Sequence, residues 1–198
     1  MQWRRIVLTI VWGTVILAGF VALARYSVTA GARGDVPDQW PDDGLSRAAP
    51  WELVVFLHPR CPCSLATVRQ LARLEPQASK SFAIRTVFWE PLHATPEFRR
   101  GVNLDAARSL TRGEVVHDSG GHIAERFGAV TSGHVVLYDQ EGRLRFSGGV
   151  TLVRAHEGTA PGWTALARLL RGEADTIEEA PVFGCPLFDP KPCEGCEE

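Results

Sequence analysis

Residues 51–74 read WELVVFLHPRCPCSLATVRQLARL. The first seven residues are apolar except for Glu52 and rich in β-forming types, which is typical of a short buried strand. Beyond residue 64, Leu65, Val68 and Leu71 recur at the spacing of one face of a helix. This stretch therefore predicts a strand that leads directly into a helix, with Cys61 and Cys63 at the turn between them.

The chain alternates in the same way as far as residue 172. Apolar runs predict further strands at 82–89, 114–117, 134–138 and 144–147, and helical spacing predicts helices at 97–111, 121–127 and 162–170. Strands that alternate with helices favour one α/β domain over residues 51–172, in which a mixed sheet is flanked by helices. We expect the strand at 134–138 to run antiparallel to the first two strands.

A membrane anchor is predicted at the start of the chain, over residues 1–25. Residues 6–24 are uncharged and apolar. As a helix this run is about 28 Å long, close to the ~30 Å hydrocarbon core of a bilayer. A cleaved signal peptide is the alternative, although the run is longer than the usual signal core.

Two further segments flank the predicted domain. Residues 26–50 contain repeated glycine and proline without an apolar period, so they are predicted as a linker. Residues 173–198 form an acidic tail that carries Cys185, Cys193 and Cys196. The short N-terminal stub favours an orientation with the soluble domain in the periplasm or another extracytoplasmic compartment, where disulfides persist.

The overall composition limits the class of protein. The chain has 198 residues, of which 45% are apolar and 22% charged, and its net charge is −2. A disordered chain would be less apolar and more highly charged. A nucleic-acid-binding domain would show a clear excess of clustered basic residues, so we expect no nucleic-acid partner.

Cys61 has the sequence environment of a reactive thiol. It lies where a strand gives way to a helix, and the free N–H groups and partial positive charge of a helix N-terminus favour a thiolate. Pro62 suits the first helical position because its missing N–H is not needed there. Arg60 and His58 add positive charge nearby. We therefore expect Cys61 to be the nucleophile.

The partner of Cys61 is open between two cysteines. Residues two apart in a helix point about 200° from each other, so a disulfide from Cys61 to Cys63 would be strained and easily reduced. Cys185 follows the domain on a short tether and is the other candidate to resolve a mixed disulfide. The five cysteines are an odd number, so disulfides within one chain cannot use them all.

Three loops are expected around Cys61, because the strand ends on that edge of the sheet meet there: 90–96, 130–133 and 148–160. They carry groups that could tune a thiol or hold a proton, although each is more commonly a solvated loop residue: Glu90, His93, Ser132, His156 and Glu157.

The chain resembles the thioredoxin-like superfamily. Residues 56–61 (FLHPRC) stand where that family has its strand end and first active cysteine, and residues 128–139 (GAVTSGHVVLYD) look like the segment that carries its cis-proline. The chain is most similar to RedB-type proteins, which are membrane-anchored and thioredoxin-like. The matching parts are the N-terminal span and residues 58–64, 126–151, 154–158 and 182–187. The resemblance implies a thioredoxin-like fold.

Two departures from ordinary thioredoxin are visible against this resemblance. The motif is Cys61-Pro62-Cys63-Ser64, so that Ser64 occupies the usual resolving position and Cys63 comes one residue early. Gly133 takes the place of the cis-proline, and a trans bond is expected there because a cis bond before a non-proline residue costs ~2.5–4 kcal/mol. These differences bring the chain nearer to the peroxiredoxin-like and copper-chaperone branches of the fold.

The resulting prediction is a membrane-anchored thiol–disulfide oxidoreductase without a cofactor, acting on protein thiols or disulfides. The first alternative is a copper-binding protein whose ligands are Cys61, Cys63 and His58, since soft thiolates favour Cu⁺. The second is a thiol peroxidase that uses Cys61. The pair Cys193 and Cys196 is expected to be either a metal-ligating Cys-x-x-Cys or a terminal disulfide. The direction of electron flow, the partner protein and the oligomeric state are left open.

Overall fold

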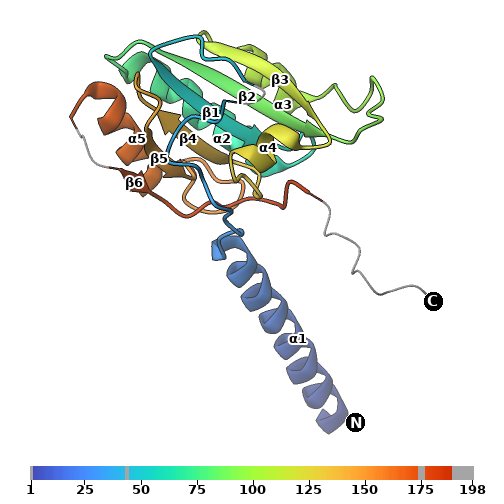
Figure 1. Cartoon of the computed structure of the whole chain (residues 1–198). Coiled ribbons are helices and arrows are strands. Elements are labelled where there is room, and N and C mark those ends of the chain that lie inside the picture. The colour runs from blue at the N-terminus through green and yellow to red at the C-terminus, as the bar shows by residue number, and fades with distance from the viewer. Residues whose placement is uncertain (1, 43–44, 174–176, 189–198) are drawn as a thin grey trace.

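A computed structural model describes residues 2–42, 45–173 and 177–188. Helix α1 (Gln2–Val28) projects alone from one end of a folded domain (Figure 1). None of its residues is buried, and an 18-residue window within it has a mean hydropathy of 2.5. By length and composition α1 can cross a membrane, as a signal sequence near an N-terminus also could.

The domain is built on one six-stranded sheet. Its strands are β1 (Trp51–Leu57), β2 (Phe82–Glu90), β3 (Gly113–Ser119), β4 (His134–Tyr138), β5 (Leu144–Gly148) and β6 (Glu178–Glu179), in the order β3-β2-β1-β4-β5-β6. Strands β1, β2 and β3 are parallel, whereas β4 is antiparallel to both β1 and β5. The expected direction of β4 is confirmed. Strand β6 was not predicted, because two residues are too few to show a period.

Helices cover both faces of the sheet. Helices α2 (Pro62–Leu74), α3 (Val102–Arg108) and α5 (Pro161–Arg171) pack their apolar residues on one face. On the other face lies α4 (His122–Arg126), and a 3₁₀ turn, η1 (Glu75–Gln77), follows α2. The mixed sheet flanked by helices is the architecture that the sequence predicts.

The predicted helix at 97–111 is wrong in its extent. Helix α3 covers only Val102–Arg108, and turns occupy residues 96–99. Gly101 precedes the helix with a φ of +141°, a conformation that L side chains rarely adopt and that interrupts a continuous helix. Helix α2 begins at Pro62, which occupies the first helical position as expected.

The segment predicted as a linker lies in large part against the domain. The Trp40 ring packs edge-on against Phe127 at 5.2 Å and against Tyr138 at 5.4 Å. The partly buried side chains of Val36 and Leu45 join the same cluster. This segment therefore completes the sheet face that the short helix α4 leaves uncovered.

The end of the described chain crosses the edge of the sheet where β1 ends. We call residues 180–188 the C-terminal strap. Its Cys185 O accepts a hydrogen bond from Ser132 N at 2.8 Å, and its Leu187 N donates to Val130 O at 2.9 Å. The strap thus pairs with the loop before β4. Cys193 and Cys196 lie outside the described residues.

Candidate functional site

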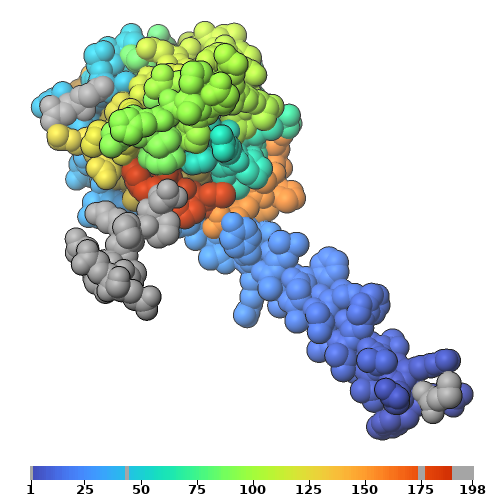
Figure 2. Space-filling view, turned by 90° about the vertical axis from the view of Figure 1, so that its right-hand side faces the viewer, coloured from blue at the N-terminus to red at the C-terminus, as the bar shows by residue number. Residues whose placement is uncertain are grey.

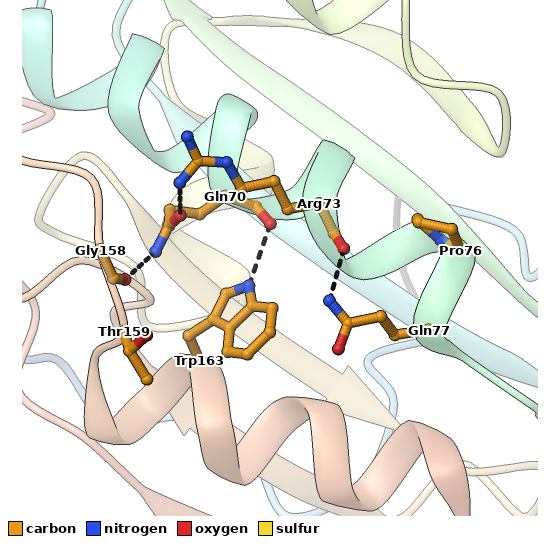
Figure 3. A pocket seen from close by; sticks show the side chains of 7 residues that line it. All are labelled: Gln70, Arg73, Pro76, Gln77, Gly158, Thr159 and Trp163. Atoms are coloured by element: carbon orange, nitrogen blue, oxygen red, sulfur yellow. Dashed lines mark hydrogen bonds between the residues drawn. The ribbon is translucent and has the colours of Figure 1, made fainter.

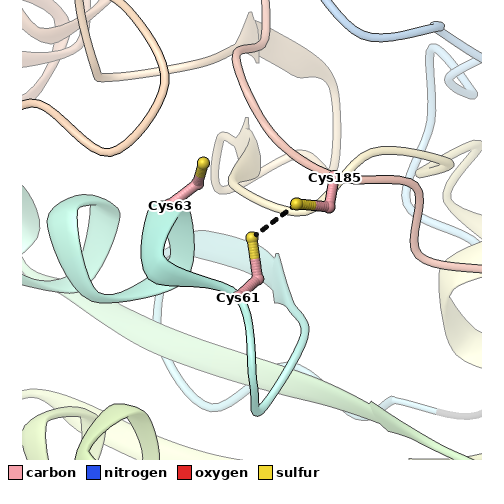
Figure 4. Close-up of side chains that lie close together, drawn as sticks. All are labelled: Cys61, Cys63 and Cys185. Carbon is pink, nitrogen blue, oxygen red and sulfur yellow. Dashed lines mark hydrogen bonds between the residues drawn. The ribbon is translucent and has the colours of Figure 1, made fainter. Parts of the chain in front are cut away.

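Three thiols meet at the N-terminus of α2. The Sγ atoms of Cys61, Cys63 and Cys185 all lie within 4.8 Å of one another, and those of Cys61 and Cys185 are 3.2 Å apart (Figure 4). Cys61 and Cys63 are buried, Cys185 is half-buried, and none of the three is in a disulfide. The structure therefore brings both candidate partners to Cys61.

The loop that carries Cys61 is fixed by one buried amide. Asn103 Nδ2 donates to the carbonyl oxygens of Pro59 at 2.8 Å, Cys61 at 2.9 Å and His58 at 3.3 Å. Asn103 lies on α3, so the packing of α3 against α2 sets the course of residues 58–61. Sequence reasoning missed Asn103, since a single asparagine in a helix gives no sign of what it will contact.

Two serines hold the other side of this loop. The Oγ atoms of Ser64 and Ser132 are 2.8 Å apart, and each accepts a hydrogen bond from His58 N at 3.1 Å. Ser64 Oγ in turn donates to His58 O at 2.9 Å. Ser64, at the position of the usual resolving cysteine, is thus a buried structural link between α2 and the loop before β4.

The Cys61 thiol is strongly acidic. A hydrogen bond from the Cys63 thiol lowers the pKa of Cys61 most, and burial works against it. The backbone N–H and thiol of Cys185 and the backbone N–H of Cys63 lower it further, to about 4. Cys61 is therefore a thiolate at neutral pH, surrounded by donors from both neighbouring cysteines.

The two other thiols are held protonated by this arrangement. The hydrogen bond to Cys61, burial and the Cys61 charge raise the pKa of Cys63, while the backbone of Ala155 acts in the opposite sense. Burial, then the hydrogen bond and charge of Cys61, raise the pKa of Cys185 to about 11. The Arg154 charge lowers the Cys185 value. The cluster thus holds one negative charge and two protons.

Ala155 and Arg154 are functional candidates that sequence reasoning missed. Ala155 has a φ of +56°, which is uncommon for a residue other than glycine and is a form of local strain. This turn is what points the Ala155 backbone at Cys63. The loop 148–160 was expected around Cys61, but nothing in the sequence indicated the backbone conformation of Ala155 or the contacts of Arg154.

The loop before β4 approaches the strap closely. Gly133 has a φ of +89°, and no peptide bond among the described residues is cis, so the bond before Gly133 is trans as expected. Gly133 N donates to Phe56 O at 2.7 Å. A Cβ on Gly184 would lie 1.8 Å from Ser132 O. Only a glycine at residue 184 lets the strap backbone come near enough to deliver Cys185.

The His58 ring packs against an aromatic side chain. It stacks on Trp89 with centroids 5.5 Å apart, and its Nδ1 accepts a hydrogen bond from Arg60 N at 3.2 Å. The Arg60 guanidinium lies over the ring of Phe98. The ligand set predicted from the sequence was Cys61, Cys63 and His58, whereas the structure groups Cys185 with the two thiols in place of His58.

The other predicted loop residues have partners of their own. Glu157 pairs with Arg69 and Arg73 on α2, and Glu90 pairs with Arg99. His156 is exposed, and its Nδ1 lies 2.7 Å from Arg154 O. His93 is also exposed. Among these five loop residues, Ser132 is the one that hydrogen-bonds both to the Cys61 loop and to the strap.

A separate pocket of about 420 Å³ lies between α2 and α5, and Cys61, Cys63 and Cys185 do not line it (Figure 3). Its polar groups bond one another: Arg73 donates to Gln70 Oε1 at 3.2 Å and Trp163 Nε1 donates to Gln70 O at 3.1 Å. Gln70 Nε2 also donates to Gly158 O. These hydrogen bonds join α2 to α5 and to the loop before it.

Comparisons with known proteins give the fold. No protein-family model matches the sequence, and no curated protein matches it significantly. A hypothetical protein from Sinorhizobium meliloti 1021 is 22% identical, with a TM-score of 0.55 over 81% of this chain and 94% of its own. An uncharacterized conserved protein from Geobacillus kaustophilus is 16% identical, with a TM-score of 0.57 over 83% and 94%.

A secreted Mycobacterium tuberculosis disulfide oxidoreductase, homologous to E. coli DsbE, is 13% identical, with a TM-score of 0.43 over 62% of this chain and 81% of its own. The sheet itself has β1-α2-β2 parallel and the β4–β5 hairpin antiparallel, with the cysteines where β1 passes into α2. This mixed sheet flanked by helices on both faces is the thioredoxin-like fold that the sequence predicts. Within this thioredoxin-like domain, the strap adds a third thiol from outside the strand–helix turn.

Proposed function

We propose that this chain is a membrane-anchored thiol–disulfide oxidoreductase of the RedB type, with Cys61 as nucleophile and Cys185 as resolving thiol. The observation that carries the proposal is the contact between a Cys61 thiolate, whose pKa is about 4, and the Cys185 thiol at 3.2 Å. A sulfur of low pKa beside a second thiol is the arrangement that thiol–disulfide exchange requires.

The exchange proceeds in two balanced steps. The Cys61 thiolate attacks one sulfur of a partner disulfide, forms a mixed disulfide with it and expels the other partner sulfur as a thiolate, which takes up a proton from water. Cys185 then attacks Cys61 Sγ, forms the Cys61–Cys185 disulfide and releases the second partner thiolate, which takes the proton that Cys185 has lost. Two electrons pass from this dithiol to the partner; oxidation of a partner dithiol is the same sequence in reverse.

The charge distribution favours this order. While Cys61 is a thiolate, its hydrogen bond and its charge help to hold Cys185 protonated. Once Cys61 is bound in a mixed disulfide, both of these effects are gone and the Arg154 charge still favours the Cys185 thiolate. Burial, the largest cause of the raised pKa of Cys185, remains, but this pKa falls once the nucleophile has reacted. Cys63 serves as the main donor that keeps Cys61 ionised.

We assign the remaining parts of the chain to this function. Residues 1–25 anchor the protein, and the domain stands in the periplasm or another extracytoplasmic compartment, where protein disulfides are stable. The partners are protein thiols and disulfides. The proposed parts of the chain are the anchor at 1–25, a segment at 26–50 that packs in large part on the domain, the domain at 51–172 and the cysteine-containing tail at 173–198.

Three cysteine variants test the proposal against a peptide disulfide. We expect Cys61→Ser to abolish exchange, and Cys185→Ser to accumulate a mixed disulfide with the peptide that is visible by intact mass. The double variant Cys193→Ser, Cys196→Ser is the control and should exchange at the wild-type rate. Retained exchange in Cys61→Ser would contradict the assignment of the nucleophile.

A thiolate metal site is the second candidate, because three sulfurs lie within 4.8 Å. Metal–thiolate bonds of about 2.3 Å place sulfurs around one ion at roughly this separation. Three soft ligands favour Cu⁺. Cys61, Cys63 and Cys185 would hold the ion, and a disulfide between any two of them would exclude it.

Metal uptake separates the two candidates. Reduced protein carrying Cys193→Ser and Cys196→Ser is titrated with Cu⁺ under anaerobic conditions and examined by intact mass. One tightly held ion per chain that is lost in Cys63→Ser and in Cys185→Ser, but kept in His58→Ala, would support the thiolate metal site. Absence of uptake, with a Cys61–Cys185 pair titrating between about −120 and −270 mV, would support the oxidoreductase alone.

A further inference from the structure

One arginine joins the end of α1 to the strap that carries Cys185. Arg154 Nε donates to Tyr26 O at 3.1 Å, Arg154 N donates to Ser27 O at 3.2 Å, and the guanidinium reaches Thr29 O at 3.3 Å. The same guanidinium lies over the Tyr26 ring and donates to Gly184 O. A single side chain therefore spans from the last turn of α1 to the residue before Cys185.

A second set of contacts fixes the same arrangement independently. Gly31 N donates to Val182 O at 2.8 Å, and Thr131 Oγ1 donates to Ala32 O at 2.7 Å. The residues directly after α1 thus run beside both the strap and the loop before β4. The strap, red in the colour scale, lies at the end of the domain from which α1 projects (Figures 1 and 2).

The bilayer surface can be placed along α1. The uncharged run ends at Ala24, and Arg25 and Tyr26 follow it. Arginine and tyrosine are the side chains found at the headgroup level at the ends of membrane spans. Arg154 bonds to the backbone of Tyr26 itself, so the Arg154 guanidinium and Gly184 lie close to that level.

The most exposed of the three thiols belongs to the strap. Cys61 is 3% exposed and Cys63 is 2% exposed, so both are covered within the domain. Cys185 is half-buried and belongs to the strap, which lies against the residues that follow α1. The strap also indicates which molecule the site accepts, because it is an extended segment that presents a cysteine to Cys61 through backbone pairing with Ser132 and Val130.

We propose that the thiol cluster works at the membrane surface and exchanges disulfides with a cysteine in an extended segment of a membrane-anchored protein, just outside the bilayer. The inference rests on the proposed thiol–disulfide exchange and on α1 as a membrane span. It adds where the partner cysteine lies, just outside the bilayer, and the extended conformation of the partner segment that carries it. The exchange steps are those given above, with the partner disulfide supplied by the anchored protein.

Distance to the bilayer is measured in vesicles that contain the full chain. A fluorophore is attached at Leu152→Cys, an exposed position two residues from Arg154, in a background with the five native cysteines replaced by serine. The matched control is Ser79→Cys, which is exposed and lies beyond the opposite end of α2 from Cys61. We expect lipid headgroup nitroxides to quench the label at residue 152 several-fold more than the label at residue 79. Equal quenching would overturn the inference.

A functional comparison uses one cysteine peptide disulfide in two forms, attached to a transmembrane peptide in the same vesicles or free in solution. The wild type is compared with a chain carrying about ten glycine and serine residues inserted between Arg25 and Tyr26, which lets the domain move ~17 Å from the bilayer. We expect the insertion to lower the rate with the anchored peptide several-fold and to leave the rate with the free peptide unchanged.

The outcomes separate the two proposals. Loss of reaction with the free peptide in the wild type would overturn the proposed exchange itself. The wild type could react with the free peptide while the insertion leaves the ratio of the anchored to the free rate unchanged. That result would leave the proposed exchange intact and overturn the membrane-surface inference. A chain that carbonate washing removes from the vesicles would overturn the anchor and, with it, this inference.

Discussion

The sulfur atoms of Cys61 and Cys185 lie 3.2 Å apart although 124 residues separate them in the sequence. Cys61 belongs to the turn between β1 and α2, whereas Cys185 belongs to the strap, which follows the last helix of the domain in the sequence. The surroundings of the nucleophile therefore include the strap, which lies outside the strand–helix unit. The low pKa of Cys61 depends in part on the strap staying in place.

Removing the Cys63 thiol should raise the pKa of Cys61. In Cys63→Ala the main hydrogen bond to the Cys61 thiolate is lost, while burial continues to disfavour the charged form. We expect the midpoint of the pH dependence of Cys61 alkylation to rise from about 4 by at least ~1 unit. Cys196→Ser is the control and should leave the midpoint unchanged; a wild-type midpoint near that of a free thiol would contradict the geometry.

The stability of the reduced protein should increase with pH. Because the pKa of Cys61 is lowered in the fold from its ordinary 9.0, its contribution is complete above that value and is lost as the pH falls toward 4. His134, whose pKa burial lowers to about 4, gives a similar trend only below its ordinary 6.5. Between pH 7 and 8.5 we therefore expect the Tm of reduced wild type to rise and that of Cys61→Ser to stay nearly constant. An identical pH dependence in both proteins would argue against a buried thiolate.

Gly184→Ala should displace the strap without unfolding the domain. An added Cβ would lie 1.8 Å from Ser132 O, so the backbone must move and Cys185 must leave Cys61. We expect slower formation of the Cys61–Cys185 disulfide and a raised pKa of Cys61, as measured by thiol counting and alkylation. Far-UV circular dichroism should remain that of the wild type. A variant that forms the disulfide at the wild-type rate would show that the close approach is unimportant.

Shortening the chain should reveal that residues 26–50 belong to the folded unit. A chain beginning at residue 51 loses the contacts of Trp40 with Phe127 and Tyr138. Because loss of a well-packed tryptophan side chain costs about 3–5 kcal/mol and Trp40 is only half-buried, we expect a loss of about 2 kcal/mol or more in the free energy of unfolding relative to a chain beginning at residue 26. Urea unfolding measures the difference. Trp40→Ala in the longer chain should reproduce most of it, and equal stability of the two shortened chains would contradict the packing role.

The elements with strong local patterns were predictable, and the long-range contacts were not. The apolar runs of β1 and β2 and the helical spacing of α2 are properties of consecutive residues, so the turn that carries Cys61 could be placed from the sequence. Trp40 lies among prolines and acidic residues without an apolar period, and nothing local indicates that it packs on the sheet. The same holds for Asn103 and Ala155, which contact residues 58–63 only after the domain has closed.

Cys185 follows Cys61 by 124 positions, which affects when the site can form during synthesis. With synthesis at roughly 5–20 residues per second, about 6–25 s pass between the emergence of Cys61 and that of Cys185 from the ribosome. During that interval α1 has long been available to the membrane, while Cys61 and Cys63 lack the third sulfur. The site is therefore assembled only when the strap, synthesised well after Cys61, docks beside the residues that follow α1.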